Sequence, residues 1–156
     1  EVDCVVIEID KTKEKALRLL DFRSHSEEEL RQKLVRAGGT EIDEVLSFCR
    51  EYKFIDDRSY AKKLAHDLQH LKKYGKKRIK DELLSRGIDT EFTEEAIALL
   101  EDDESERLMP LVCRKLGNNF EQKNIDKVIR YFLYRGYKFN DIKNCIDELK
   151  ENCNGI

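Results

Sequence analysis

The 156-residue chain has no tryptophan, only one proline and only seven glycines. Sandwiches and barrels need many tight turns, which depend on glycine and proline, so this scarcity favours helices. No apolar run reaches the roughly 18 residues that a membrane-spanning helix requires. No signal peptide is recognisable either, so we expect a cytoplasmic protein that makes no membrane contact.

The cysteines follow no disulfide or metal pattern. They are odd in number and scattered, and no Cys-x-x-Cys pair occurs among them. Disulfide frameworks usually have an even, dense set, so we expect reduced thiols in the cytosol. The five are Cys4, Cys49, Cys113, Cys145 and Cys153.

Catalytic and metal-binding motifs are also missing. The sequence has no Gly-x-Ser-x-Gly elbow, no phosphate-cradling glycine loop and no His-Glu-x-x-His motif. His66 and His70 are four residues apart and could share a helix face, but a third and a fourth ligand are lacking. We therefore find no catalytic constellation in the sequence and expect no metal and no cofactor.

Charge is what the chain has in abundance. Charged residues make up 40% of it, against roughly 25% in an ordinary globular protein. Amphipathic helices that each bury one stripe suit such a composition. The charges are segregated: residues 58–87 carry ten Lys or Arg and three Asp or Glu, a net +7, whereas residues 88–107 carry nine acids and one base, a net −8.

The first half of the chain gives clear start and stop signals. Residues 2–9 are β-branched and partly alternating, which predicts a short strand within an extended segment over residues 1–11. A helix is predicted from about Thr12 to Phe22. Ser26 and Glu29 then form a capping box for the next helix, in which each residue bonds the other's backbone N–H. Thr40 is predicted to cap a third helix, and Asp56 or Asp57 a fourth.

The second half contains two ambiguous points. Residues 101–106, EDDESE, are equally suited to a linker and to the solvated first turn of a helix. Pro110 lies inside an apolar helical pattern, so that helix either begins near Met109 or is kinked there. Asn140 is predicted to cap the last helix.

An internal repeat organises the whole chain. Three helix-ending glycines, Gly38, Gly87 and Gly136, are each 49 residues apart, and four sets of apolar residues follow the same step. This predicts an all-α fold, an elongated array of three tandem three-helix repeats over residues 12–53, 54–102 and 103–156, with the short N-terminal strand in addition. The apolar sets are Leu30, Ile79 and Val128; Leu34, Leu83 and Phe132; Val35, Leu84 and Leu133; and Phe48, Ile97 and Ile146.

Basic residues give the strongest functional signal. Clustered Lys and Arg neutralise phosphates and release counter-ions, which favours nucleic-acid binding, and Tyr74 within the cluster could stack on an unpaired base. A solvated helix face, or a protein partner with alternating charges, would use the same residues. The candidate binding residues are Lys62, Lys72, Lys73, Lys76, Lys77, Arg78, Lys80, Lys123, Lys127 and Arg130.

Three segments together resemble the RecX family of regulatory proteins. They are ALRLLDFRSHSEEELRQKL from Ala16, FIDDRSYAKKLA from Phe54, and KYGKKRIKDELLSRGI from Lys73, so the resemblance covers residues 16–88. Lys53 departs from the pattern, because the family often has glycine there. Arg23, Asp56 and Asp57 match positions of the family pattern, and the resemblance implies structural roles for them.

The resemblance implies a protein that is not an enzyme but a monomeric helical-repeat regulator that binds the RecA recombinase filament on DNA. It would inhibit ATP hydrolysis and strand exchange by RecA and restrain the SOS response, with the basic residues facing RecA or its DNA. Two other readings of the residues remain open. One is a protein that binds single- or double-stranded DNA directly, and the other is an adaptor that binds only protein.

Overall fold

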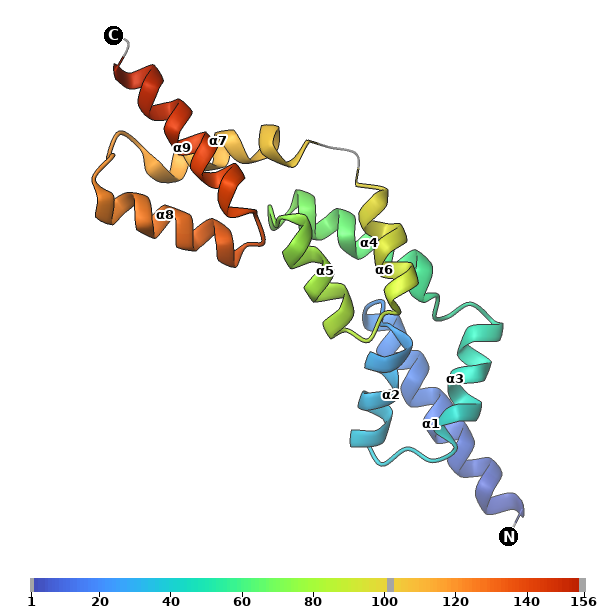
Figure 1. The fold of residues 1–156 in the computed structure, drawn as a ribbon. Helices are drawn as coiled ribbons and strands as arrows, with labels where there is room; N and C mark the ends of the chain where they lie inside the picture. The colour runs from blue at the N-terminus through green and yellow to red at the C-terminus, as the bar shows by residue number, and fades with distance from the viewer. Residues whose placement is uncertain (1, 101–102, 155–156) are drawn as a thin grey trace. The chain divides into compact units, whose positions relative to one another are not determined.

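The computed structural model describes the backbone of residues 2–100 and 103–154, and the side chains of residues 10–100 and 103–153 (Figure 1). The described residues form nine α-helices and no strand, so the predicted all-α class is confirmed. The helices are α1 (Val2–Phe22), α2 (Glu27–Arg36), α3 (Ile42–Glu51), α4 (Asp57–His70), α5 (Lys76–Ser85), α6 (Thr90–Ala98), α7 (Glu104–Leu116), α8 (Gln122–Tyr134) and α9 (Phe139–Asn154).

The N-terminal strand and extended segment are wrong predictions. Residues 2–9 belong to α1, which therefore begins ten residues before the predicted start at Thr12. The β-branched residues favour a strand by propensity, but a strand needs a partner for its backbone groups. The described chain offers no other strand, whereas a helix satisfies most backbone groups within itself.

The chain divides into two compact units whose boundaries fall inside helices. Unit 1 comprises Glu1–Leu64 and Glu82–Ala96, and unit 2 comprises Ala65–Asp81 and Ile97–Ile156. Helices α4, α5 and α6 therefore each contribute residues to both units. The predicted boundaries between three repeats do not coincide with this division.

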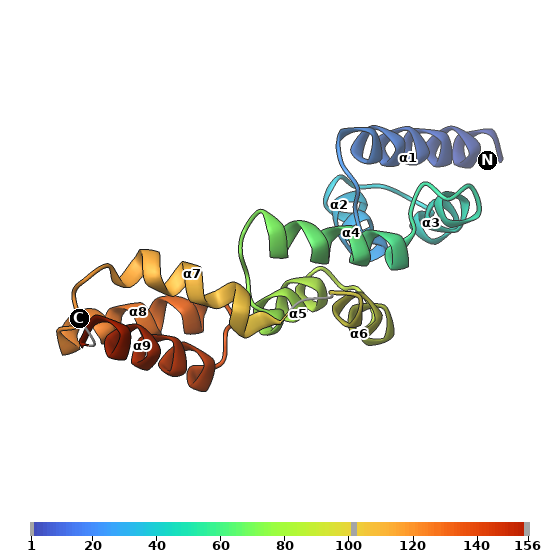
Figure 2. The ribbon, with the colours of Figure 1, turned by 90° about the horizontal axis from the view of Figure 1, so that it is seen from above.

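Unit 1 is built around α1, α2 and α3, which lie side by side (Figure 2). Leu30 and Leu34 of α2 are fully buried, because they lie four residues apart on the face that meets the other two helices. Each contributes about 2 kcal/mol by leaving water. The remaining core residues are Ala16, Val45, Leu46, Cys49 and Ile55.

Unit 2 has its own core between α7, α8 and α9 (Figure 1). Leu108 and Val112 of α7 face Val128 and Phe132 of α8, and all four are buried. The other core residues are Leu116, Tyr137, Ile142, Cys145 and Ile146. Each unit therefore has a core cluster in which three helices meet.

The 49-residue step is confirmed in the helices that precede the three glycines. Gly38, Gly87 and Gly136 have φ of +72°, +74° and +93°, the left-handed region in which glycine is at ease. Two of the apolar sets lie in these helices, and all of their residues are buried: Leu30, Ile79 and Val128, and Leu34, Leu83 and Phe132. Another set, Val35, Leu84 and Leu133, is exposed, although we expected it in the apolar stripe.

The predicted caps have mixed outcomes. The capping box of α2 is present, since the Ser26 hydroxyl accepts from the Glu29 N–H and the Glu29 carboxylate accepts from the Ser26 N–H. Asp56 caps α4 by accepting from the Ser59 N–H at 3.1 Å. Thr40 does not cap α3, because Glu41 takes the cap position with φ +48° and makes no side-chain cap bond. Asn140 lies inside α9 rather than before it.

The ambiguous stretch before α7 is partly resolved. Glu101 and Asp102 lie outside the described residues, Asp103 caps α7, and Glu104 begins it, so residues 104–106 are helical. The alternative start near Met109 is wrong, because α7 continues through Pro110. Pro110 and Glu106 are both exposed, and proline removes the N–H that would donate to the Glu106 carbonyl in a regular helix.

Candidate functional site

The predicted basic residues fall mostly in unit 2. Lys72 and Lys73 lie in the loop between α4 and α5, the next four lie in α5, and the last three lie in α8. Lys62 is the exception, since it belongs to the part of α4 in unit 1. The α5 residues are Lys76, Lys77, Arg78 and Lys80, and the α8 residues are Lys123, Lys127 and Arg130.

Lys62 is engaged locally. Its ammonium lies 3.0 Å from the Glu95 carboxylate, and the Arg58 guanidinium lies 3.1 Å from the same group. Hydrogen bonding from Lys62 and the positive charge of Arg58 hold the pKa of Glu95 below its usual range. The positive charge of Lys62 is therefore largely neutralised by Glu95 within unit 1.

The α4–α5 loop is fastened to the C-terminal end of α8 inside unit 2. The Gly75 N–H donates to the Arg135 carbonyl at 2.8 Å, and the Tyr137 hydroxyl donates to the Lys73 carbonyl at 2.7 Å. The Arg135 guanidinium donates to the Lys72 carbonyl. Because backbone carbonyls make these bonds, the side chains of Lys72 and Lys73 stay exposed.

Gly136 makes this fastening a close one. A Cβ added at Gly136 would lie 2.3 Å from the Arg78 nitrogen, and one added at Gly75 would lie 2.4 Å from the Gly136 carbonyl oxygen. We call this contact between the start of α5 and the end of α8 the second junction. It requires glycine at both positions.

A row of alternating cations and tyrosine rings lies beside the second junction. The Arg78 guanidinium is 4.9 Å from the Tyr134 ring centre and 5.5 Å from that of Tyr74. The Arg135 guanidinium is 5.0 Å from Tyr74 and 5.2 Å from Tyr131. The Lys115 ammonium, from α7, completes the row 4.1 Å from Tyr131. We call these six residues the cation–ring row.

A cavity of about 260 Å³ adjoins one end of the row. Of its described lining residues, four are cationic and none is acidic. Tyr131 supplies an aromatic wall, and Leu111 and Phe132 are the apolar residues. The four cations are Lys73, Arg114, Lys115 and Arg135. The cavity therefore suits an anion.

Sequence reasoning missed most of this arrangement. It named Tyr74 and Arg78, but not Tyr131, Tyr134 or the α7 cations Arg114 and Lys115. A signal was present in the spacing, because Tyr74 and Arg78, like Tyr131 and Arg135, are four residues apart, which is the step between neighbours on a helix face. Tyr74 lies just before α5 and Arg135 just after α8. The second junction, which brings the two pairs together, could not be read from the sequence.

Unit 1 contains a corresponding first junction, between the start of α2 and the end of α5. The Ser26 hydroxyl donates to the Arg86 carbonyl, and Glu29 receives the guanidinium groups of Arg86 and Arg23 at 3.3 and 3.1 Å. The Tyr60 hydroxyl donates to Glu29 at 3.2 Å. Burial alone would raise the pKa of Glu29, but the Ser26 N–H and the Arg23 guanidinium hold it below its usual range.

Asp57 and Arg23, which match positions of the RecX signature, also make structural contacts. Asp57 accepts from the Glu27 N–H at 2.9 Å and so ties α4 to α2 within unit 1. Burial, followed by the nearby charges of Glu27 and Asp89, raises the pKa of Asp57 although the Glu27 N–H opposes the rise. Arg23 donates to Glu29 and to the Ser24 carbonyl.

His25 is a buried titratable residue next to the first junction. Its Nδ1 lies 2.8 Å from the Arg23 carbonyl and must donate, because a carbonyl only accepts. Its Nε2 then accepts from the Lys33 ammonium at 2.8 Å. Burial, together with the charges of Arg23 and Lys33, lowers the pKa of His25 although the Arg23 carbonyl favours the protonated ring.

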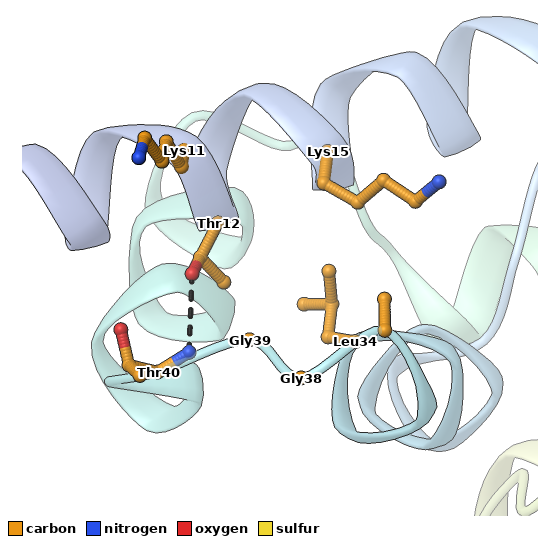
Figure 3. A pocket seen from close by; sticks show the side chains of 8 residues that line it. Lys11, Thr12, Lys15, Leu34, Gly38, Gly39 and Thr40 are labelled. Atoms are coloured by element: carbon orange, nitrogen blue, oxygen red, sulfur yellow. Dashed lines mark hydrogen bonds between the residues drawn. The ribbon is translucent and has the colours of Figure 1, made fainter.

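A second cavity, of about 280 Å³, lies between α1 and the α2–α3 loop of unit 1 (Figure 3). Lys11 and Lys15 flank it, but the loop's N–H groups are already used. The Thr40 N–H donates to the Thr12 hydroxyl at 3.2 Å, and the Gly39 N–H donates to the Leu34 carbonyl. The cavity therefore lies where the α2–α3 loop packs against α1.

The remaining candidates from the sequence are the histidine pair and the cysteines. The rings of His66 and His70 stack 4.0 Å apart, and no group of three metal-ligating side chains occurs among the described residues. The cysteines whose side chains are described, Cys49, Cys113, Cys145 and Cys153, are free thiols. No helix in the described part of the chain is long and apolar enough to cross a membrane.

Comparison with known proteins decides the family. A model described as "RecX, first three-helix domain" matches residues 13–49, and one described as "RecX, second three-helix domain" matches residues 56–97. A protein of Salmonella paratyphi B named "Regulatory protein RecX" is 37% identical to the chain, with 83% of this chain and 86% of the relative covered. The chain belongs to the RecX family. The RecX protein of Salmonella typhimurium is 36% identical over the same shares.

Solved RecX structures have the same fold. The crystal structure of RecX from Lactobacillus salivarius matches with a TM-score of 0.76 and 24% identity, and covers 93% of this chain and 98% of its own. Another crystal structure, of a regulatory protein RecX, matches with a TM-score of 0.81 and 19% identity over 92% and 75%. At these identities the likeness supports the fold alone.

Proposed function

We propose that this RecX-family protein binds the RecA recombinase filament on DNA and inhibits its ATP hydrolysis and strand exchange, and thereby restrains recombination, repair and the SOS response. The chain would act by binding, as a cytoplasmic monomer, and not as an enzyme. Membership of a family whose relatives are named regulatory proteins carries the proposal. The cationic surface of unit 2 supports it, because both RecA-bound DNA and an acidic protein face would be attracted to such a surface.

We further propose that the chain works as three three-helix repeats, over residues 12–53, 54–102 and 103–156. The 49-residue step and its three left-handed glycines support this organisation. The two junctions do so too, because equivalent residues form both of them. Helix α1 would extend the first repeat into residues 2–11.

The deciding measurement is the ATPase rate of RecA on single-stranded DNA with increasing amounts of the chain. Inhibition well below one chain per RecA protomer is expected, since one bound regulator would act on many protomers. An unchanged ATPase rate at an excess of the chain would contradict the proposal.

A charge-reversal pair tests the proposed residues. Replacing Lys72, Lys73, Lys76 and Lys77 with Glu is expected to abolish inhibition, because the unit 2 surface would then repel DNA and acidic protein alike. The matched control replaces Lys11, Lys15, Arg36 and Lys63, exposed cations of unit 1, with Glu and is expected to inhibit like the parent. Equal inhibition by both variants would show that the residues are assigned wrongly.

Direct DNA binding without RecA is the second candidate function. The four-cation cavity of unit 2 favours it. Such binding should weaken by orders of magnitude between about 50 and 200 mM salt if several phosphates are contacted. Salt-insensitive inhibition of RecA would instead favour a contact with protein alone.

A further inference from the structure

We propose that the cation–ring row and its adjoining cavity form a binding site for an unpaired nucleic-acid strand, which the chain distinguishes from a duplex without help from RecA. The inference goes beyond RecA regulation and rests on unit 2 alone. It concerns Tyr134, Arg78, Tyr74, Arg135, Tyr131 and Lys115, together with the cavity residues Lys73 and Arg114.

The arrangement of charge is the first argument. Four cations line one small cavity, and no carboxylate occurs among its described lining residues, so the local potential there is positive. In unit 1, by contrast, the corresponding junction places Glu29 between Arg23 and Arg86. A phosphate in the unit 2 cavity would take the place that Glu29 has in unit 1. The cavity therefore favours an anionic ligand over water.

The rings are the second argument. Tyr134 is 71% exposed and Tyr131 38% exposed, although both contact a guanidinium or ammonium group. A solvent-exposed ring supported by a cation offers its open face for stacking on a base. Tyr134 is therefore the residue we assign to base stacking.

The alternation is the third argument. Along the row, a cation follows each ring, just as a phosphate follows each base along a single strand. A duplex hides the faces of its bases inside the stack, so only its phosphates could use the row. We therefore expect a preference for unpaired strands that depends on Tyr134, and a charge-dependent component shared by both forms.

The experiment uses the full chain alone and a fluorescently labelled oligonucleotide of about 20 thymidines, longer than the ~4–16 nucleotides that one single-strand-binding module covers. The same oligonucleotide annealed to its complement is the duplex probe. Anisotropy titrations are expected to give an affinity about tenfold higher for the unpaired strand. Comparable affinities for the two probes would overturn the inference.

Variants separate stacking from charge. Tyr134→Ala is expected to lower affinity for the unpaired strand about fivefold or more, and affinity for the duplex less than about twofold, because stacking on one base is worth roughly 1–3 kcal/mol. Tyr134→Phe keeps the ring and should bind like the parent. If Tyr134→Ala binds the unpaired strand unchanged, or loses both probes equally, the inference is wrong. Because Tyr134 is exposed, the variant is expected to fold, which its circular dichroism checks.

The charged component has a matched control. Arg114→Gln with Lys115→Gln removes two cavity cations and should weaken binding of both probes and lower the salt slope by about one to two. Arg36→Gln with Lys63→Gln removes equal charge from unit 1 and should leave binding within about twofold. If the control pair weakens binding as much as the cavity pair, the site is not in the cavity.

The outcome for RecA is separable from this result. Suppose that the parent binds neither probe and that Tyr134→Ala no longer inhibits RecA. The cation–ring row would then be a protein contact, which overturns the nucleic-acid site and leaves the proposed regulation intact. Selective binding of the unpaired probe by a chain that does not inhibit RecA would confirm the site and contradict the regulation.

Discussion

The first and second junctions are built alike but charged differently. In each, the carbonyl of an arginine at the end of one helix, Arg86 or Arg135, accepts a hydrogen bond from a residue just before another helix, Ser26 or Gly75. These pairs are related by the 49-residue step. The next glycine, Gly87 or Gly136, lies against the start of that other helix. The contact at the arginine carbonyl is thus repeated, with a hydroxyl donor in unit 1 and a backbone N–H donor in unit 2.

The side chains at the two junctions differ in charge. Glu29 in the first junction is replaced at the equivalent position by Arg78 in the second. Glu29 lies between two guanidinium groups in the first junction, whereas the guanidinium groups of Arg78 and Arg135 in the second lie against tyrosine rings. The same contact between helix ends thus carries an ion cluster in unit 1 and a row of cations and rings in unit 2. This difference is why we place ligand binding in unit 2.

The largest effect is expected from alanine at the repeat glycines, in a graded order. Gly136→Ala would place a Cβ 2.3 Å from the Arg78 backbone nitrogen at a φ of +93°, so overpacking and left-handed strain together should cost about 3–5 kcal/mol. Gly87→Ala would place a Cβ 2.4 Å from the Glu28 Cβ, which is fixed by the Glu28 backbone, so this variant should also cost more than Gly38→Ala. Gly38→Ala meets nothing within 4 Å and should cost about 1–2 kcal/mol from strain alone.

Urea unfolding of the three variants measures this order. A loss at Gly38 equal to that at Gly136 would mean that conformation, and not the close approach at the second junction, determines the requirement for glycine. The comparison between junctions would then lose its backbone part.

The second effect concerns the carboxylate of the first junction. Glu29→Gln keeps a residue able to complete the capping box but removes the negative charge between Arg23 and Arg86, and should cost about 2 kcal/mol near pH 7. Because the folded pKa of Glu29 is lowered, its stabilisation is present above the unfolded value near 4.3 and is lost as the pH falls through the folded value. Urea unfolding of both proteins should therefore show the difference shrinking toward pH 3.

Arg31→Gln is the control for Glu29→Gln. Its partners Asp43 and Glu28 are exposed or partly so, and such pairs contribute about 0–1 kcal/mol. A difference between parent and Glu29→Gln that is independent of pH would refute the role of the Glu29 charge.

The sequence predicted more of the scaffold than of the site. The 49-residue step correctly located three left-handed glycines and the buried residues that precede them, because a helix end and a core position each impose a local requirement on residue type. The strand at residues 2–9 failed because its propensity was outweighed by the lack of a pairing partner. Thr40 failed as a cap because Glu41, at φ +48°, takes the cap position of α3.

The site depended on contacts that no local pattern contains. Lys72, Lys73 and Arg78 could be named from charge density alone. Their relation to Tyr131 and Tyr134 requires the hydrogen bond between Gly75 and Arg135, which joins residues 60 positions apart. The equivalent glycines were visible in the sequence, but the sequence did not show that Gly87 and Gly136 each lie against the start of another helix.

The third effect is a pH dependence that belongs to unit 1. Protonating His25 would put a second cation 2.8 Å from the Lys33 ammonium, so the neutral ring is favoured in the folded state. Because the folded pKa of His25 is lowered, its contribution is present above the unfolded value near 6.5 and is lost as the pH falls through the folded value. Unfolding free energy should therefore decline on going from pH 7 toward pH 5, and His25→Asn should show a smaller decline.

Lys33→Met tests the cause of that decline. Removing the ammonium should reduce the pH dependence while His25 and its bond to the Arg23 carbonyl remain. A decline of the same size in the parent and in both variants would assign it to other groups.

The smallest effect is expected at Lys62, the one candidate binding residue in unit 1. Its pair with Glu95 is partly exposed, and Arg58 also reaches that carboxylate, so Lys62→Gln should cost no more than about 0.5 kcal/mol. Because Glu95 already neutralises the charge of Lys62, the variant's inhibition of RecA and its affinity for oligonucleotides should both lie within about twofold of the parent's. Lys73→Gln, which removes one charge from the unit 2 cavity, is the matched comparison and should weaken oligonucleotide binding more. Equal losses for the two variants in the anisotropy titration would mean that unit 1 contributes to the ligand surface, and that the difference in charge between the two junctions does not determine where the ligand binds.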